Sequence, residues 1–196
     1  KIKNFFVGII IILFFSTLIP FLGGLADRLL LNKNIPFSVY SDIEKIQSIK
    51  NSFNDEIMPI MKKWDETLSK LDDSSVSNYK NNIMLCNTLL RLNDERYKKF
   101  SEFKEKIIPY LKEYSPFHLQ KINELSSLGE RYKYLIDKSY KARKEYYQAV
   151  LQKKPYKEIR RLIKETNEAL AGAQKLESAI SKLLKELQKK DMQVKR

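Results

Sequence analysis

Histidine and cysteine, the side chains that most often bind metals or attack substrates, each occur once in this sequence, as His118 and Cys86. A di-iron centre in a helical bundle requires Glu-x-x-His on two helices, and Ser115 occupies the position three residues before His118. A structural zinc requires four ligands, which these two residues cannot supply. The G-x-S-x-G motif and glycine-rich phosphate loops are also missing from the sequence. We therefore predict that the protein is not an enzyme and binds no metal or cofactor.

A stretch in which basic and aromatic residues are mixed, residues 138–164, is the remaining candidate for a binding site. It contains many Lys and Arg, interleaved with tyrosines, against only Glu145 and Glu158. Such a surface attracts phosphate-rich partners, of which we expect an anionic lipid or cell-wall polymer rather than nucleic acid. The alternative is an ordinary solvated helix face. The candidate contact residues are Tyr140, Arg143, Lys144, Tyr147, Lys153, Lys154, Lys157, Arg160, Arg161 and Lys164.

Four other residues carry side chains that could take part in chemistry, but each is better explained by its place in a helix. We expect His118 to be exposed in a first helical turn and Cys86 to be a small core residue. Trp64 is expected in the core, with a ligand groove near Pro59 as the alternative. Asn93 occupies a seam position, where a polar side chain sets the register between helices.

The first part of the chain is apolar, with no charged residue between positions 4 and 26. As a helix rising about 1.5 Å per residue, this stretch reaches roughly 34 Å, enough to cross the ~30 Å hydrocarbon layer of a bilayer. We predict a single-pass transmembrane anchor over residues 1–28, with the rest of the chain outside the cytoplasm. A cleaved signal peptide is the main alternative, although its apolar core is usually only about 7–15 residues. A buried core helix is a third.

A predicted linker, residues 29–40, leads to the first two of four amphipathic helices. Residues 41–44, with the sequence SDIE, match a capping box that starts the first helix. Pro59 is expected to kink or split that helix, because a proline removes one backbone hydrogen bond. Residues 72–75 form a turn, and the second helix follows as far as Pro109.

The third helix is predicted to start at Ser115-Pro116 and the fourth after residues 153–155, since proline suits the first helical position. The fourth helix has the clearest seven-residue repeat, and residues 191–196 form a disordered tail. The repeat consists of Ile159, Leu162, Thr166, Ala169, Ala173, Leu176, Ile180, Leu183 and Leu187. The predicted fold is all-α: an N-terminal transmembrane helix followed by an elongated up-down four-helix bundle over residues 41–190. Two splayed hairpins completed by a partner's helices are the alternative.

Three small residues in the fourth helix, Ala169, Gly172 and Ala173, make a thin region that another helix could approach closely. We therefore predict a non-enzymatic, membrane-anchored scaffold that binds a protein partner, or a second copy of itself, through helix packing. The formal net charge of +13, which is concentrated toward the carboxyl end, supports the alternative that residues 138–164 bind an anionic polymer or lipid. A ligand-sensing bundle is the third possibility.

Overall fold

The computed structural model describes residues 37–193, and this part of the chain consists of helices and the turns that join them, with no strand, as predicted. Its elements are α2 (Phe37–Ser69), a short 3₁₀ helix η1 (Val76–Asn78), α3 (Tyr79–Tyr114), α4 (Pro116–Leu151) and α5 (Tyr156–Gln193). No helix among these is long and apolar enough to cross a membrane. The predicted anchor, residues 1–28, lies outside the described residues.

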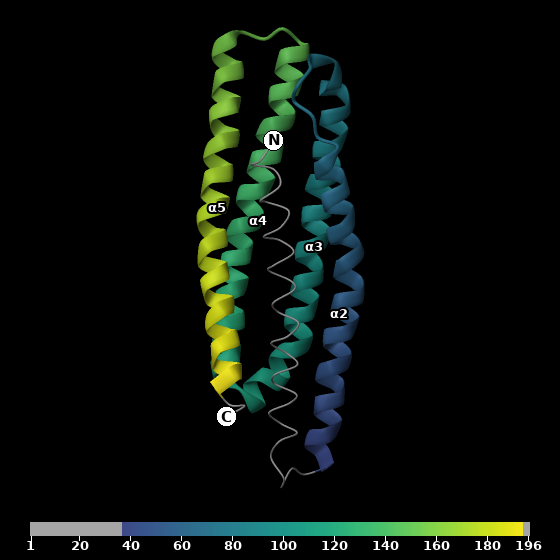
Figure 1. The fold of residues 1–196 in the computed structure, drawn as a ribbon, viewed down its shortest axis with the longest axis vertical. Helices are drawn as coiled ribbons and strands as arrows, with labels where there is room; N and C mark the ends of the chain where they lie inside the picture. The colour runs from purple at the N-terminus through teal and green to yellow at the C-terminus, as the bar shows by residue number, and fades with distance from the viewer. Residues whose placement is uncertain (1–36, 194–196) are drawn as a thin grey trace.

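The four long helices lie side by side and form a helical bundle (Figure 1). Each helix packs against the next one along the chain, so the contacts are α2 with α3, α3 with α4 and α4 with α5. The described parts of α2 and α5 share no interface of comparable size. Short turns join the helices, so successive helices run in opposite directions (Figure 1). The α2–α3 and α4–α5 connections therefore lie at the same end of the bundle, opposite the start of α2.

The core follows the predicted helical periodicity. In α5 the seven-residue repeat is buried at each position from Leu162 to Leu183, and Ile159 at its start is half-buried. Cys86 and Trp64 lie in the core, at 0% and 1% exposure, so both predictions are confirmed. Asn93 is buried as well and donates to Lys133 O (3.2 Å) and Asp137 Oδ1 (2.8 Å) of α4. It therefore links α3 to α4 at one register, as predicted.

The predicted start of the first helix was wrong. The helix α2 begins at Phe37, four residues before the expected capping box, so residues 37–40 are helical and do not belong to a linker. Proline is favoured at the entrance to a helix, and Pro36 directly precedes this one. The side chain of Asp42 accepts hydrogen bonds from Tyr114 Oη (2.7 Å) and Lys45 Nζ (3.1 Å). The sequence that was expected to cap the helix therefore makes a contact between α2 and α3 instead.

Two prolines lie inside helices that continue past them. Pro59 does not split α2, and α3 extends beyond Pro109 to Tyr114. Both prolines are exposed, so the carbonyl that each leaves without a helical hydrogen bond can be hydrated. The predicted tail also starts too early, because α5 includes residues 191–193. Lysines 189 and 190 favour this extension, since positive charge stabilises the carboxyl end of a helix.

Candidate functional site

The predicted basic and aromatic surface divides into a buried part and an exposed part. Tyr140, Arg143 and Tyr147 are buried, at 3%, 8% and 0% exposure, so their assignment to an exposed binding surface was wrong. Lys144 is half-buried on α4. The six candidates that follow the end of α4 are exposed: Lys153, Lys154, Lys157, Arg160, Arg161 and Lys164.

The buried part fastens the α2–α3 connection to α4. Arg143 Nε donates to Tyr147 Oη (2.7 Å), and both side chains hydrogen bond to the carboxylate of Asp73. The Tyr147 ring also contacts the ring of Tyr79 on α3, with centroids 4.8 Å apart. Burial and then the Asp73 carboxylate raise the pKa of Tyr147, so its hydroxyl stays protonated and can donate. Arg143 and Tyr147 are therefore structural, because both side chains are buried and bonded to Asp73.

In the exposed part, two of the six cations form ion pairs with carboxylates of the described chain and four do not. Arg161 pairs with Glu165 (3.3 Å) and Lys164 with Glu168 (3.7 Å), one helical turn further along α5. Within the described part of the chain, the other four form no ion pair. We name this group the basic tip, and it consists of Lys153, Lys154, Lys157 and Arg160.

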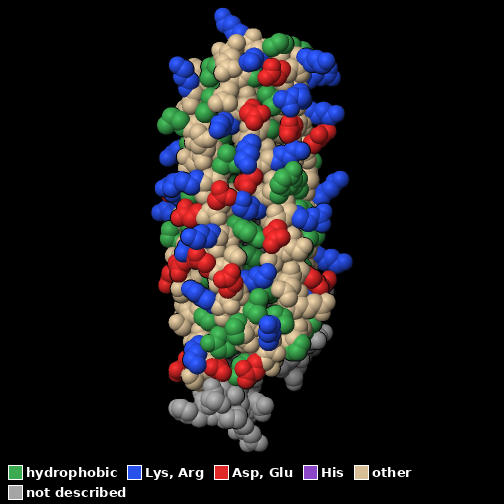
Figure 2. Space-filling model, turned by 180° about the vertical axis from the view of Figure 1, so that it is seen from behind, with side chains coloured by type: hydrophobic (Ala, Val, Ile, Leu, Met, Phe, Trp, Pro, Cys, Tyr) green, Lys and Arg blue, Asp and Glu red, His purple; other side chains and the backbone are tan. Residues whose placement is uncertain are grey.

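The basic tip occupies the end of the bundle where α4 turns into α5 (Figure 1). The opposite face of the molecule shows Lys and Arg side chains along its whole length, including this end, with Asp and Glu side chains between them (Figure 2). Since like charges that lie close together raise the local potential, the end of the bundle with the basic tip attracts anions.

The backbone of the turn is unusual at Lys153, whose φ of 54° lies in the left-handed region. Lys154 N donates to Ala149 O (2.9 Å) and Lys153 N donates to Val150 O (3.0 Å). This pattern is the Schellman motif, in which glycine usually occupies the left-handed position because side chains are strained there. The turn therefore ends α4 tightly and holds a lysine at a position that favours glycine.

Replacing Lys153 with glycine is expected to raise the free energy of unfolding by up to about 1 kcal/mol, because the strain at positive φ is removed. Denaturant unfolding followed by circular dichroism measures this change. Lys154→Gly is the control, since Lys154 is not among the described residues with positive φ. Equal stability changes in the two variants would contradict the assignment of the motif.

The thin region of α5 is used within the chain. Ala169 and Ala173 are buried, at 3% and 1% exposure. A Cβ atom added at Gly172 would lie 3.1 Å from Leu135 Cδ1 of α4. The close helix approach that these small residues predicted is therefore present, but the neighbour is α4 and the region is not open to a partner.

Gly172→Leu is expected to lower the free energy of unfolding by about 1–3 kcal/mol, because the added side chain must separate α4 from α5. Thermal and denaturant unfolding measure the loss. Gly129→Leu in α4 is the matched control, since nothing lies within 4 Å of a Cβ at that position. The idea of a tight α4–α5 contact fails if both variants are as stable as the wild type.

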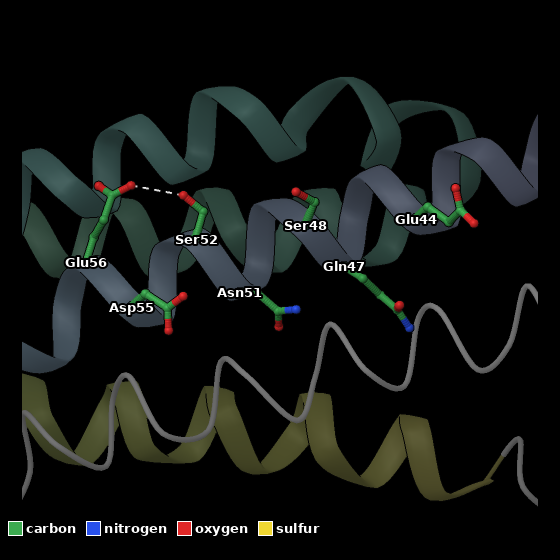
Figure 3. A pocket seen from close by; sticks show the side chains of 7 residues that line it. All are labelled: Glu44, Gln47, Ser48, Asn51, Ser52, Asp55 and Glu56. Carbon is green, nitrogen blue, oxygen red and sulfur yellow. Dashed lines mark hydrogen bonds between the residues drawn. The ribbon is translucent and has the colours of Figure 1, made fainter.

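No ligand groove opens at Trp64. Its indole is covered by the guanidinium of Arg96, 4.8 Å from the ring centroid, and by the ring of Tyr140 at 5.8 Å. The described surface does contain a hollow of about 580 Å³ on α2, shown in Figure 3. The described residues that line it are all polar and belong to α2: Glu44, Gln47, Ser48, Asn51, Ser52, Asp55 and Glu56. None of these described residues is one of the apolar or aromatic side chains that usually dominate small-molecule sites.

The remaining reactive side chains are also explained by packing. Burial raises the pKa of the Cys86 thiol to about 12, so it is not a nucleophile. His118 was expected on the surface but is fully buried, and its Nδ1 hydrogen bonds to the hydroxyl of Ser115. The prediction was wrong because the Ser115 hydroxyl, which makes no cap hydrogen bond to the backbone of α4, supplies a polar partner for the buried ring. Glu177, a buried carboxyl on α5, was missed altogether, and the described residues contain no metal-binding cluster.

Comparisons with known proteins identify no relative: no family model, no curated protein and no solved structure matches this chain.

Proposed function

We propose that the protein is a non-enzymatic scaffold: an elongated up-down helical rod, anchored in a membrane by residues 1–28, whose free end binds an anionic partner. The observation that carries the proposal is the basic tip, a set of exposed cations without carboxylate partners among the described residues. The tip lies at the end of the bundle opposite the start of α2 (Figure 1). An anchor that precedes α2 would therefore leave the tip facing away from the membrane in which the anchor lies.

The length of the bundle supports this arrangement. The helix α3 has 36 residues, which at about 1.5 Å per residue corresponds to roughly 54 Å. Exposed charges separated from each other by more than the ~8–10 Å Debye length act independently, so the tip is screened from any charge near the anchor. We place the rod outside the cytoplasm, as the sequence predicts.

Reversing three charges of the basic tip tests the proposal. With polyphosphate as a soluble anionic probe, Lys153→Glu, Lys154→Glu and Lys157→Glu together are expected to weaken binding by at least about tenfold, and binding by the wild type should fall as salt increases. A variant with Lys175, Lys182 and Lys185 replaced by Glu is the control, because these exposed α5 lysines change the net charge equally. If both variants lose the same amount of binding, the loss depends only on the net charge of the protein, and a localised site is refuted.

A protein partner or a second copy of the chain is the second candidate. The observation that favours it is the missing interface between the described parts of α2 and α5, since helices of a partner could pack along these edges. Light scattering of the detergent-solubilised protein measures its oligomeric state, and analysis of the chains that co-purify with it identifies a protein partner. A monomer that purifies alone would argue against it.

A further inference from the structure

The turn that carries the basic tip also exposes apolar side chains. Tyr156, the first residue of α5, is 76% exposed, and Leu151, the last residue of α4, is 36% exposed. Tyr156 has the highest exposure among the large hydrophobic residues of the described chain. These two residues flank residues 152–155, so lysines and apolar side chains share one turn. A third exposed apolar residue, Val76 at 52%, lies in the α2–α3 connection at the same end.

This combination of side chains matches the interface of a membrane better than it matches a soluble polyanion. Tyrosine is favoured at the boundary between headgroups and hydrocarbon, where its ring is in an apolar and its hydroxyl in a polar environment. Lysines beside it can hold their aliphatic chains along the apolar surface and their ammonium groups at the lipid phosphates. A soluble polyanion would neutralise the lysines but would leave Leu151 in water.

The shape of the turn also suits contact with a flat surface. The Schellman motif at Lys153 ends α4 within a few residues, and α5 starts at Tyr156. The axes of α4 and α5 follow the long direction of the bundle, so the turn forms part of its end (Figure 1). A bilayer can therefore be contacted end-on, without contact to the sides of the helices.

From this arrangement we infer that the partner of the basic tip is the surface of an anionic lipid bilayer, into which Tyr156 and Leu151 insert while the lysines bind headgroup phosphates. This inference rests on the proposed function, because it names the anionic partner of the same site. A rod anchored at one end and bound through its tip at the other would connect two membrane surfaces.

Vesicle binding by the full chain tests the inference. The protein is held in phosphatidylcholine nanodiscs, so that residues 4–26 have the same environment in all samples, and is mixed with vesicles of phosphatidylcholine alone or with phosphatidylglycerol. We expect flotation with the phosphatidylglycerol vesicles only. The Lys153, Lys154 and Lys157 to Glu variant should bind at least about a hundredfold more weakly, since each basic residue near such a surface contributes about fivefold.

The apolar residues provide the decisive comparison. Leu151→Ser with Tyr156→Ser should weaken vesicle binding by about tenfold or more and leave polyphosphate binding unchanged. Tyr134→Ser is the matched control, because Tyr134 is 64% exposed on α4 away from the turn. Bilayer insertion is measured separately with Tyr156→Trp, whose fluorescence brominated lipids should quench, whereas that of Tyr134→Trp should not change.

The possible results separate the two proposals. If the protein binds polyphosphate but not phosphatidylglycerol vesicles, or if the Leu151 and Tyr156 double variant binds vesicles like the wild type, the lipid inference is wrong and the proposed function stands. If the charge-reversed tip binds both polyphosphate and vesicles like the wild type, both proposals are wrong. Circular dichroism of each variant checks that the helices are intact.

Discussion

Trp64→Ala is expected to lower the free energy of unfolding by about 3–5 kcal/mol, the range for truncating a large buried aromatic side chain. Trp64 on α2 is 1% exposed and contacts Arg96 of α3 and Tyr140 of α4. Its removal therefore leaves a cavity where three helices meet and also takes the aromatic face from a buried guanidinium. Denaturant unfolding of the full chain, followed by far-ultraviolet circular dichroism, measures the loss.

Two further variants separate the contributions at Trp64. Trp64→Phe keeps an aromatic face for Arg96 and should lose less stability than Trp64→Ala. Tyr134→Ala, at an exposed position, should change stability by less than about 0.5 kcal/mol. A small effect of Trp64→Ala would mean that the indole is not in the core, and it would reopen the possibility of a ligand groove near Pro59.

Much of the fold was predictable because its signals are local. Proline at positions 116 and 155 marked the starts of α4 and α5 to within a residue. The heptad repeat of α5 identified its buried seam, because periodicity depends only on which residues share a helix face. The start of α2 was missed because the polar side chains of the capping-box sequence can also lie inside a helix, where Asp42 accepts a hydrogen bond from Tyr114 of α3.

The division of the candidate site could not be predicted, since it depends on contacts between distant residues. Arg143 and Tyr147 are polar and were assigned to the surface, but Asp73, about 70 positions earlier, supplies the hydrogen bonds that allow them to be buried. Periodicity does not reveal such a partner. The small residues around Gly172 correctly indicated a close approach, yet the sequence did not show that α4 fills it.

Glu177 is expected to make the stability of the bundle depend on pH near neutrality. This α5 carboxyl is 4% exposed and accepts a hydrogen bond from Tyr132 Oη of α4 (3.1 Å). Burial raises its pKa from the ordinary value of 4.5 to about 7. Below about pH 4.5 it is protonated in both the folded and the unfolded chain and does not affect their balance. As pH rises to about 7, the unfolded chain has released a proton that the folded chain still holds, so stability falls.

Glu177→Gln isolates this effect because glutamine can still accept the hydrogen bond from Tyr132 but does not titrate. At about 1.4 kcal/mol per pH unit, the variant should be more stable than the wild type by roughly 2–3 kcal/mol at about pH 8, and the difference should nearly vanish below about pH 5. Denaturant unfolding across this range measures it. Glu168→Gln, at an exposed α5 position, is the control and should show no such dependence.

Tyr132→Phe gives an independent check on the direction of the shift. The tyrosine hydroxyl donates to the carboxyl and lowers its pKa against the larger effect of burial. Its removal should therefore raise the pKa of Glu177 in the folded chain, so that stability continues to fall to a higher pH and the total loss is larger. A shift downward would contradict the hydrogen bond between α4 and α5. If wild type and Glu177→Gln have parallel pH profiles, Glu177 is solvated and α5 does not bury it against α4.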